Sequence, residues 1–131
     1  MANSDDASIK LLYAADDGSF FTMDTVESGK PFDLVANIEI GENLNEQVDA
    51  LDLFVGVRNL TQSTPVKTVT HSEPLTPANN QEVRREIRID VEPPWTAQEG
   101  DVLEAVATLK ITHGANTDYS TAASDTFVVV S

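Results

Sequence analysis

Carboxylates are the side chains of this sequence that could do chemistry, because 22 of its 131 residues are acidic. Two groups are dense enough to suggest Ca²⁺, which prefers hard oxygen ligands clustered in loops. Asp16, Asp17 and Asp24 form the first group and supply our calcium candidates. The second group comprises Glu42, Glu46, Asp49 and Asp52. Neither has the spacing of an EF-hand loop, and solvated acidic loops are the favoured interpretation of both, so we expect no metal and no cofactor.

Nucleophilic and zinc chemistry have little support in the sequence. Cysteine is absent, which excludes disulfides, thiolate zinc sites and cysteine nucleophiles. We expect the two histidines, His71 and His113, to be exposed turn residues rather than metal ligands. No nucleophile elbow, phosphate-binding loop or glycine-rich dinucleotide motif is present. We therefore expect a protein that is not an enzyme; the alternative is a carboxylate-based hydrolase, which would need two acids in one cleft.

The charge balance narrows the classes of partner. Eight basic against 22 acidic residues give a net charge of −14. A field of that sign repels phosphate backbones and anionic lipids, so we expect neither nucleic-acid nor membrane binding. Only four of the residues are lysine, whereas 12 are aspartate. That balance resembles proteins of salt-loving organisms, with an ordinary acidic protein as the alternative.

The halophilic interpretation makes a prediction about salt. A dense negative surface repels itself and destabilises the compact state until counterions screen it. We therefore expect molar KCl to raise the melting temperature by several degrees, measured by thermal unfolding at low and high salt. A flat or falling response would contradict the halophilic interpretation.

Apolar and polar residues alternate along most of the chain, between turn signals, which is typical of half-buried strands. The expected strands cover residues 8–13, 20–23, 32–40, 51–57, 66–71, 82–91, 102–112 and 119–130, the last with a break near 122–124. About eight short strands with regular spacing predict one domain over 1–131, an all-β antiparallel sandwich of two sheets. Arg85 interrupts the apolar face of its strand.

The segment Gly100-Asp-Val-Leu-Glu-Ala-Val-Ala, a glycine-acid turn before a long alternating strand, resembles the entry to the penultimate strand of immunoglobulin-like and fibronectin-III-like domains. The resemblance implies that architecture from Phe32 onward, with no active site carried over. Three features depart from the family pattern. The disulfide is absent, Trp95 lies in a connection, and Val102 or Leu103 occupies the position that often holds tyrosine.

The terminal segments are apolar on both strand faces, at Phe20 and Phe21 and again at Val128 and Val130. Such a strand either lies beneath a loop or contacts another molecule. We therefore expect a non-enzymatic building block or accessory subunit of a larger assembly, such as a virion decoration, capsid-associated, surface or filament protein. Its partner would be another protein or a second copy, contacted in part by residues 1–24.

A ligand-binding module is the second class of function, using loops at one end of the sandwich. Trp95, Tyr13 and Tyr119 are the aromatic residues that could stack on a carbohydrate. Residues 1–8 lack the basic and apolar regions of a secretory signal, and no apolar run approaches the length of a membrane span. We expect a soluble protein, for which a virion or the cytoplasm is the most compatible location.

Overall fold

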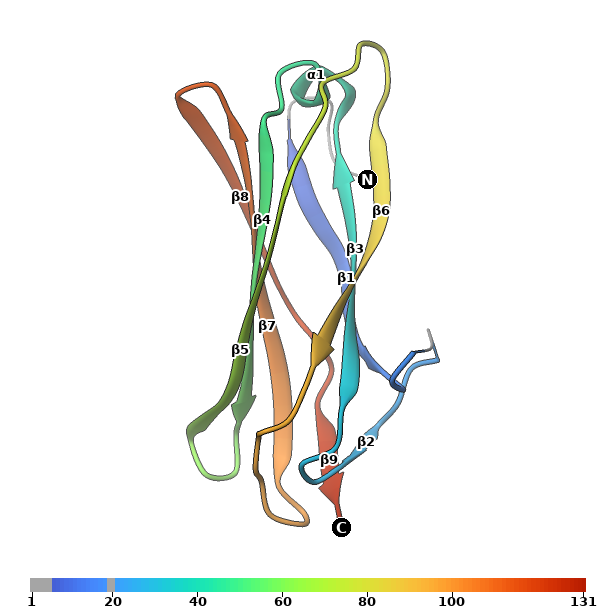
Figure 1. Cartoon of the computed structure of the whole chain (residues 1–131), viewed down its shortest axis with the longest axis vertical. Coiled ribbons are helices and arrows are strands. Elements are labelled where there is room, and N and C mark those ends of the chain that lie inside the picture. Colours follow the sequence, from blue (N-terminus) through green and yellow to red (C-terminus); the bar gives the residue numbers. More distant parts are fainter. Residues whose placement is uncertain (1–5, 19–20) are drawn as a thin grey trace.

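The computed structural model describes residues 6–18 and 21–131, and it is nearly all β (Figure 1). The strands are β1 (Ala7–Ala15), β2 (Thr25–Glu27), β3 (Phe32–Ile40), β4 (Ala50–Asn59), β5 (Thr64–Pro74), β6 (Val83–Val91), β7 (Val102–His113), β8 (Asn116–Ala123) and β9 (Phe127–Val130). One helical turn, α1 (Glu42–Asn45), lies between β3 and β4. Within residues 6–18 and 21–131, no helix is both long and apolar enough to cross a membrane.

Two sheets pack against each other as a β-sandwich, which confirms the predicted all-β, two-sheet architecture (Figure 1). The smaller sheet has the order β1-β3-β6. The larger sheet has the order β2-β9-β7-β4-β5, and β8 pairs with β7 beyond the end of β9. All pairings between named strands are antiparallel except that of β2 with β9, which is parallel.

The predicted alternation produces the core. In β7, Leu103, Ala105, Ala107, Leu109 and Ile111 are all fully buried, and their neighbours along the strand are half-buried. The inward residues of β4 lie beside them in the same sheet, and those of β3 meet them from the opposite sheet, in one continuous apolar cluster. Burial of this apolar surface is the main force that holds the two sheets together.

The chain departs from the predicted strands near its start. Of the strand expected over 20–23, Phe20 lies outside the described residues, and Thr22 forms only an isolated bridge with Ala15. The strand that follows is β2, which pairs with β9 of the larger sheet. Phe21 therefore precedes the strand instead of forming it.

Arg85 interrupts the alternation of apolar residues in β6 because its side chain links the two sheets. Its side chain leaves β6 of the smaller sheet and pairs with Glu73 of β5, an edge strand of the larger sheet. Glu73 Oε2 also lies 2.9 Å from His71 Nε2. The Arg85 hydrogen bond, together with His71, lowers the pKa of Glu73 to about 2. An inward charge of this kind also protects the open side of the sandwich from pairing with another strand.

The glycine-acid turn before β7 contains a buried carboxylate that is held by hydrogen bonds. Gly100 has a φ of +87°, a conformation that favours glycine. The Asp101 carboxylate is buried and accepts hydrogen bonds from Asn59 Nδ2 at 2.7 Å and Gln98 N at 2.9 Å. These bonds lower the pKa of Asp101 and fix the end of β4 against the start of β7.

Candidate functional site

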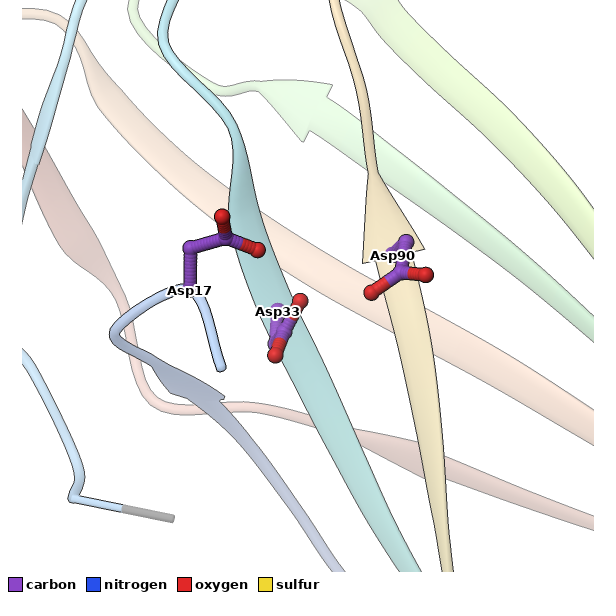
Figure 2. A group of neighbouring side chains, drawn as sticks. All are labelled: Asp17, Asp33 and Asp90. Atoms are coloured by element: carbon purple, nitrogen blue, oxygen red, sulfur yellow. The ribbon is translucent and has the colours of Figure 1, made fainter. Parts of the chain in front are cut away.

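Three aspartates from distant parts of the chain meet on the outer side of the smaller sheet (Figure 2). Asp17 lies in the turn after β1, Asp33 at the start of β3 and Asp90 near the end of β6. The strand register makes Asp33 and Asp90 direct cross-strand partners, and one carboxylate oxygen from each of the three residues lies within 4.8 Å of the others. We call Asp17, Asp33 and Asp90 the acidic cluster.

The turn after β1 explains why Asp33 is buried. Alternation places Asp33 on the outer face of β3, yet it has no exposed surface. Gly18, at a φ of +79°, directs its backbone N–H toward the carboxylate and donates to Asp33 Oδ2 at 2.9 Å. The turn thus covers a side chain that the strand pattern alone would leave in solvent.

Burial and like charge both act on Asp33. Burial raises the pKa of its carboxyl group to about 6, the Gly18 hydrogen bond opposes that rise, and the Asp90 and Asp17 carboxylates add to it. Arg88 contributes the opposite charge, with its Nε 3.3 Å from Asp33 Oδ2. Carboxylates brought this close need a proton or a cation between them, so the cluster can hold either.

The other oxygen of Asp33 has no hydrogen-bond partner within the described chain. Asp33 Oδ1 is buried, and no donor among residues 6–18 and 21–131 reaches it. A buried ionised oxygen without a partner is costly, because it has lost its contacts with water. It is therefore a position at which a ligand would stabilise the folded chain.

The sequence-predicted calcium group is only partly brought together. Asp17 belongs to the acidic cluster, whereas Asp16 and Asp24 do not, and Asp33 and Asp90 were missed. Asp17 could be predicted as a ligand because acidic residues are dense in its loop. The other two are single acids in alternating strands, and their meeting depends on the β3–β6 register, which no local pattern reveals.

The two histidines are half-buried strand residues, so the prediction of exposed turn positions was wrong. His71 lies in β5, and His113 is the last residue of β7. His113 Nε2 lies 2.7 Å from Asp118 Oδ2, on the neighbouring strand β8. Each histidine has an acidic partner, and within the described part of the chain neither joins a group of three potential metal ligands.

The proposed aromatic stacking residues do not form an exposed platform. Trp95 is only 4% exposed, because its ring packs edge-on against Phe32 at 5.6 Å between centroids. Its Nε1 donates to the carbonyl of Lys30 at 2.9 Å, so Trp95 is a core residue and not a stacking surface. Tyr119 is exposed on β8, and Tyr13 is half-buried on β1.

The outer face of the larger sheet carries a second candidate surface. Two adjacent rows of outward-facing residues cross the four strands β5, β4, β7 and β8. The residues next to them along each strand, such as Leu53, Val55 and Ala107, are buried in the core. The rows consist of Thr70, Phe54, Thr108 and Thr121, and of Thr68, Gly56, Val106 and Ala123. We call these eight residues the uncharged face. In a chain with 30 charged residues, two such rows without a charge are a distinctive surface.

A shallow groove lies at the centre of the uncharged face. It is lined by Phe54, Gly56, Thr68 and Val106, among others. Gly56 opens it by lacking a side chain, and a Cβ built there would meet only Thr68 Cγ2, at 3.9 Å. The Phe54 ring is 43% exposed beside this groove, so apolar surface is available to a partner.

The residues proposed as an interface lie in two places. Val128, 38% exposed, and the half-buried Val130 belong to β9, and Val128 pairs with Val102 on the larger sheet. Phe21 is 79% exposed and directly precedes the Thr22 bridge to β1 of the smaller sheet. Phe20 lies outside the described residues.

Comparisons with known proteins add two partial likenesses in structure. No family model matches the chain, and no curated protein matches it. A putative beta-galactosidase from Bacteroides fragilis is 15% identical, with a TM-score of 0.47 over 89% of this chain and 17% of that one. Spo0M, a sporulation control protein from Bacillus subtilis, is 13% identical, with a TM-score of 0.38 over 96% of this chain and 50% of that one. The chain thus spans half or less of the length of each.

Proposed function

We propose that this chain is a non-catalytic, immunoglobulin-like structural module that assembles with copies of itself through the uncharged face. The observation that carries the proposal is the charge-free surface around Phe54 and Gly56 in a chain of net charge −14. A building block of a larger assembly needs a surface on which like-charged copies can meet, and this face provides one.

Strand order supports the immunoglobulin-like part of the proposal. Immunoglobulin constant-type sandwiches place the first, second, fourth and fifth strands in one sheet and the third, sixth and seventh in the other. If β2 is a short continuation of the first strand, and β8 with β9 is one interrupted last strand, the sheets β1-β3-β6 and β9-β7-β4-β5 follow that scheme without its fourth strand. The edge strand β5 then corresponds to the extra strand of variable-type domains.

Electrostatics favour a second copy as the occupant of the uncharged face. The flanking rows pair Asp52 with Lys110 on one side and Arg58 with Glu104 on the other. The sign of the charge therefore changes from β4 to β7 within each flanking row, and along each strand from one flanking row to the other. When two copies meet face to face, a two-fold axis in the plane of the interface, either parallel or perpendicular to the strands, places each acid opposite a base of the other copy. A pattern that complements itself in this way suits a symmetric dimer.

The area of this surface determines how strongly two copies are expected to bind each other. With about 4.8 Å between strands and about 3.4 Å per residue, the uncharged face and its two flanking rows cover roughly 500 Å². Standard interfaces bury about 800 Å² per partner. We therefore expect a weak dimer whose population rises with protein concentration.

Light scattering after gel filtration tests this proposal, at about 10 µM and about 1 mM protein and in about 0.15 M and about 2 M KCl. We expect the mass to rise from 14.2 kDa toward twice that value with concentration, and further in high salt, where repulsion between copies is screened. A 14.2 kDa monomer under all four conditions would overturn the proposal.

Two variants locate the interface. Gly56→Arg fills the groove with a charge, and the open space at Gly56 allows the side chain without a clash, so we expect a folded monomer at every concentration. Phe21→Asp is the matched control, since it introduces a charge at an exposed position outside the uncharged face, and it should still dimerise. If Phe21→Asp dissociates the dimer and Gly56→Arg does not, the N-terminal segment forms the contact and the proposed face is wrong.

A further inference from the structure

We infer that Asp17, Asp33 and Asp90 form a binding site for one divalent cation, with Ca²⁺ as the best fit. The site lies on the smaller sheet, away from the uncharged face, and does not depend on the self-association proposed above.

Distances within the acidic cluster fit an ion of this size. Three oxygens that lie within 4.8 Å of one another leave a point within about 2.8 Å of all three. Calcium–oxygen distances are about 2.3 to 2.6 Å, so small rotations of the side chains bring all three into range. Asp17 and Asp90 are exposed, which leaves room for water molecules to complete the coordination shell.

An independent observation is the buried oxygen of Asp33. Gly18 N donates to Oδ2, and Arg88 Nε lies nearest that same oxygen. Asp33 Oδ1 is left buried, with no hydrogen-bond partner in residues 6–18 and 21–131, in a carboxylate that lies between Asp17 and Asp90 (Figure 2). A bound cation would replace the contacts that this oxygen loses on burial.

Charge and geometry indicate which ion. Three carboxylates and the nearby Arg88 guanidinium sum to −2, which one divalent cation balances. Mg²⁺ demands near-ideal octahedral geometry at about 2.0 to 2.1 Å, whereas Ca²⁺ accepts irregular oxygen sites with larger spacing. The wide, partly exposed arrangement therefore favours Ca²⁺.

Thermal unfolding and calorimetric titration of the full chain with CaCl₂ test the inference. We expect about 10 mM Ca²⁺ to raise the melting temperature by roughly 5 °C at pH 7.5, and calorimetry to give one site. Asp17→Asn, which removes an exposed ligand, should weaken binding about tenfold. Asp33→Asn should abolish the specific rise.

The adjacent residue supplies a matched control. Asp16→Asn removes one charge from the same turn without touching the cluster, so it should bind Ca²⁺ like the unaltered chain. Equal rises in the unaltered, Asp16→Asn and Asp17→Asn proteins, matched by Mg²⁺, would reflect general screening of the −14 charge and would overturn the inference. Absence of any rise with Ca²⁺ would also overturn it.

Discussion

Replacing Phe32 with alanine is expected to lower the free energy of unfolding by about 3 to 5 kcal/mol, in the range for a buried aromatic truncated to alanine. Phe32 is 1% exposed, and its ring makes edge contacts with Trp95 and Phe127, each at 5.6 Å between centroids. Truncation would leave a cavity among three elements: the start of β3, the β6–β7 connection and β9. Urea unfolding with linear extrapolation measures the loss.

Phe21→Ala is the control for this prediction, because it removes the same side chain from a position that is 79% exposed. Its effect should stay within about 0.5 kcal/mol. A loss below about 1 kcal/mol for Phe32→Ala would mean that the aromatic cluster contributes little to the packing of the two sheets.

Asp33→Asn is expected to stabilise the chain by about 2 to 3 kcal/mol at pH 7.5 without divalent cations, since a shift of one pKa unit corresponds to about 1.4 kcal/mol. The folded pKa of about 6 lies above the ordinary value of 3.8, so folding favours the protonated acid. That contribution is complete below pH 3.8 and disappears as the pH rises through 6. Asparagine does not titrate, keeps an acceptor for Gly18 N and can donate to Asp90.

The pH dependence separates this effect from an ordinary surface change. Unfolding at about pH 3 should show little difference between Asp33→Asn and the unaltered chain, and the gap should open between about pH 4 and pH 6 and stay nearly constant above that. Asp17, Asp90 and Arg88 face the same carboxyl group, and loss of the Arg88 pairing offsets part of the gain. A destabilised Asp33→Asn protein at pH 7.5 would mean that Asp33 stabilises the fold as a charged group.

Much of the sandwich could be predicted because a strand with one buried face has a period of two residues. The inward positions of β4 and β7 follow directly from that period, and their burial confirms it. The prediction of a strand over 20–23 was wrong because it assumed that an apolar residue is a buried one, and Phe21 is exposed. Arg85 could be seen to break its pattern, yet only the structure shows Glu73 across the open side of the sandwich as the reason.

The candidate sites were less predictable, since both arise from the pairing of strands. The local alternation of β3 predicts that Asp33 faces solvent. Its burial requires the turn at Gly18, which belongs to a different segment of the chain. Trp95 was assigned to a connection correctly, but its contact with Phe32 is a tertiary one. The uncharged face likewise draws its residues from four strands whose order no local pattern fixes.

The pairing of β2 with β9 has a consequence for how the chain is made. It joins Thr25 to Val128, about 100 residues apart, so a ribosome must deliver nearly the whole sandwich before this pair can form. Until then β2 has no strand beside it and Phe32 lacks the Phe127 ring. Closing such a long loop is slow compared with forming a hairpin. The nascent chain therefore passes through a stage with an open edge and an incomplete core, in which chaperones or early contact with another copy would matter most.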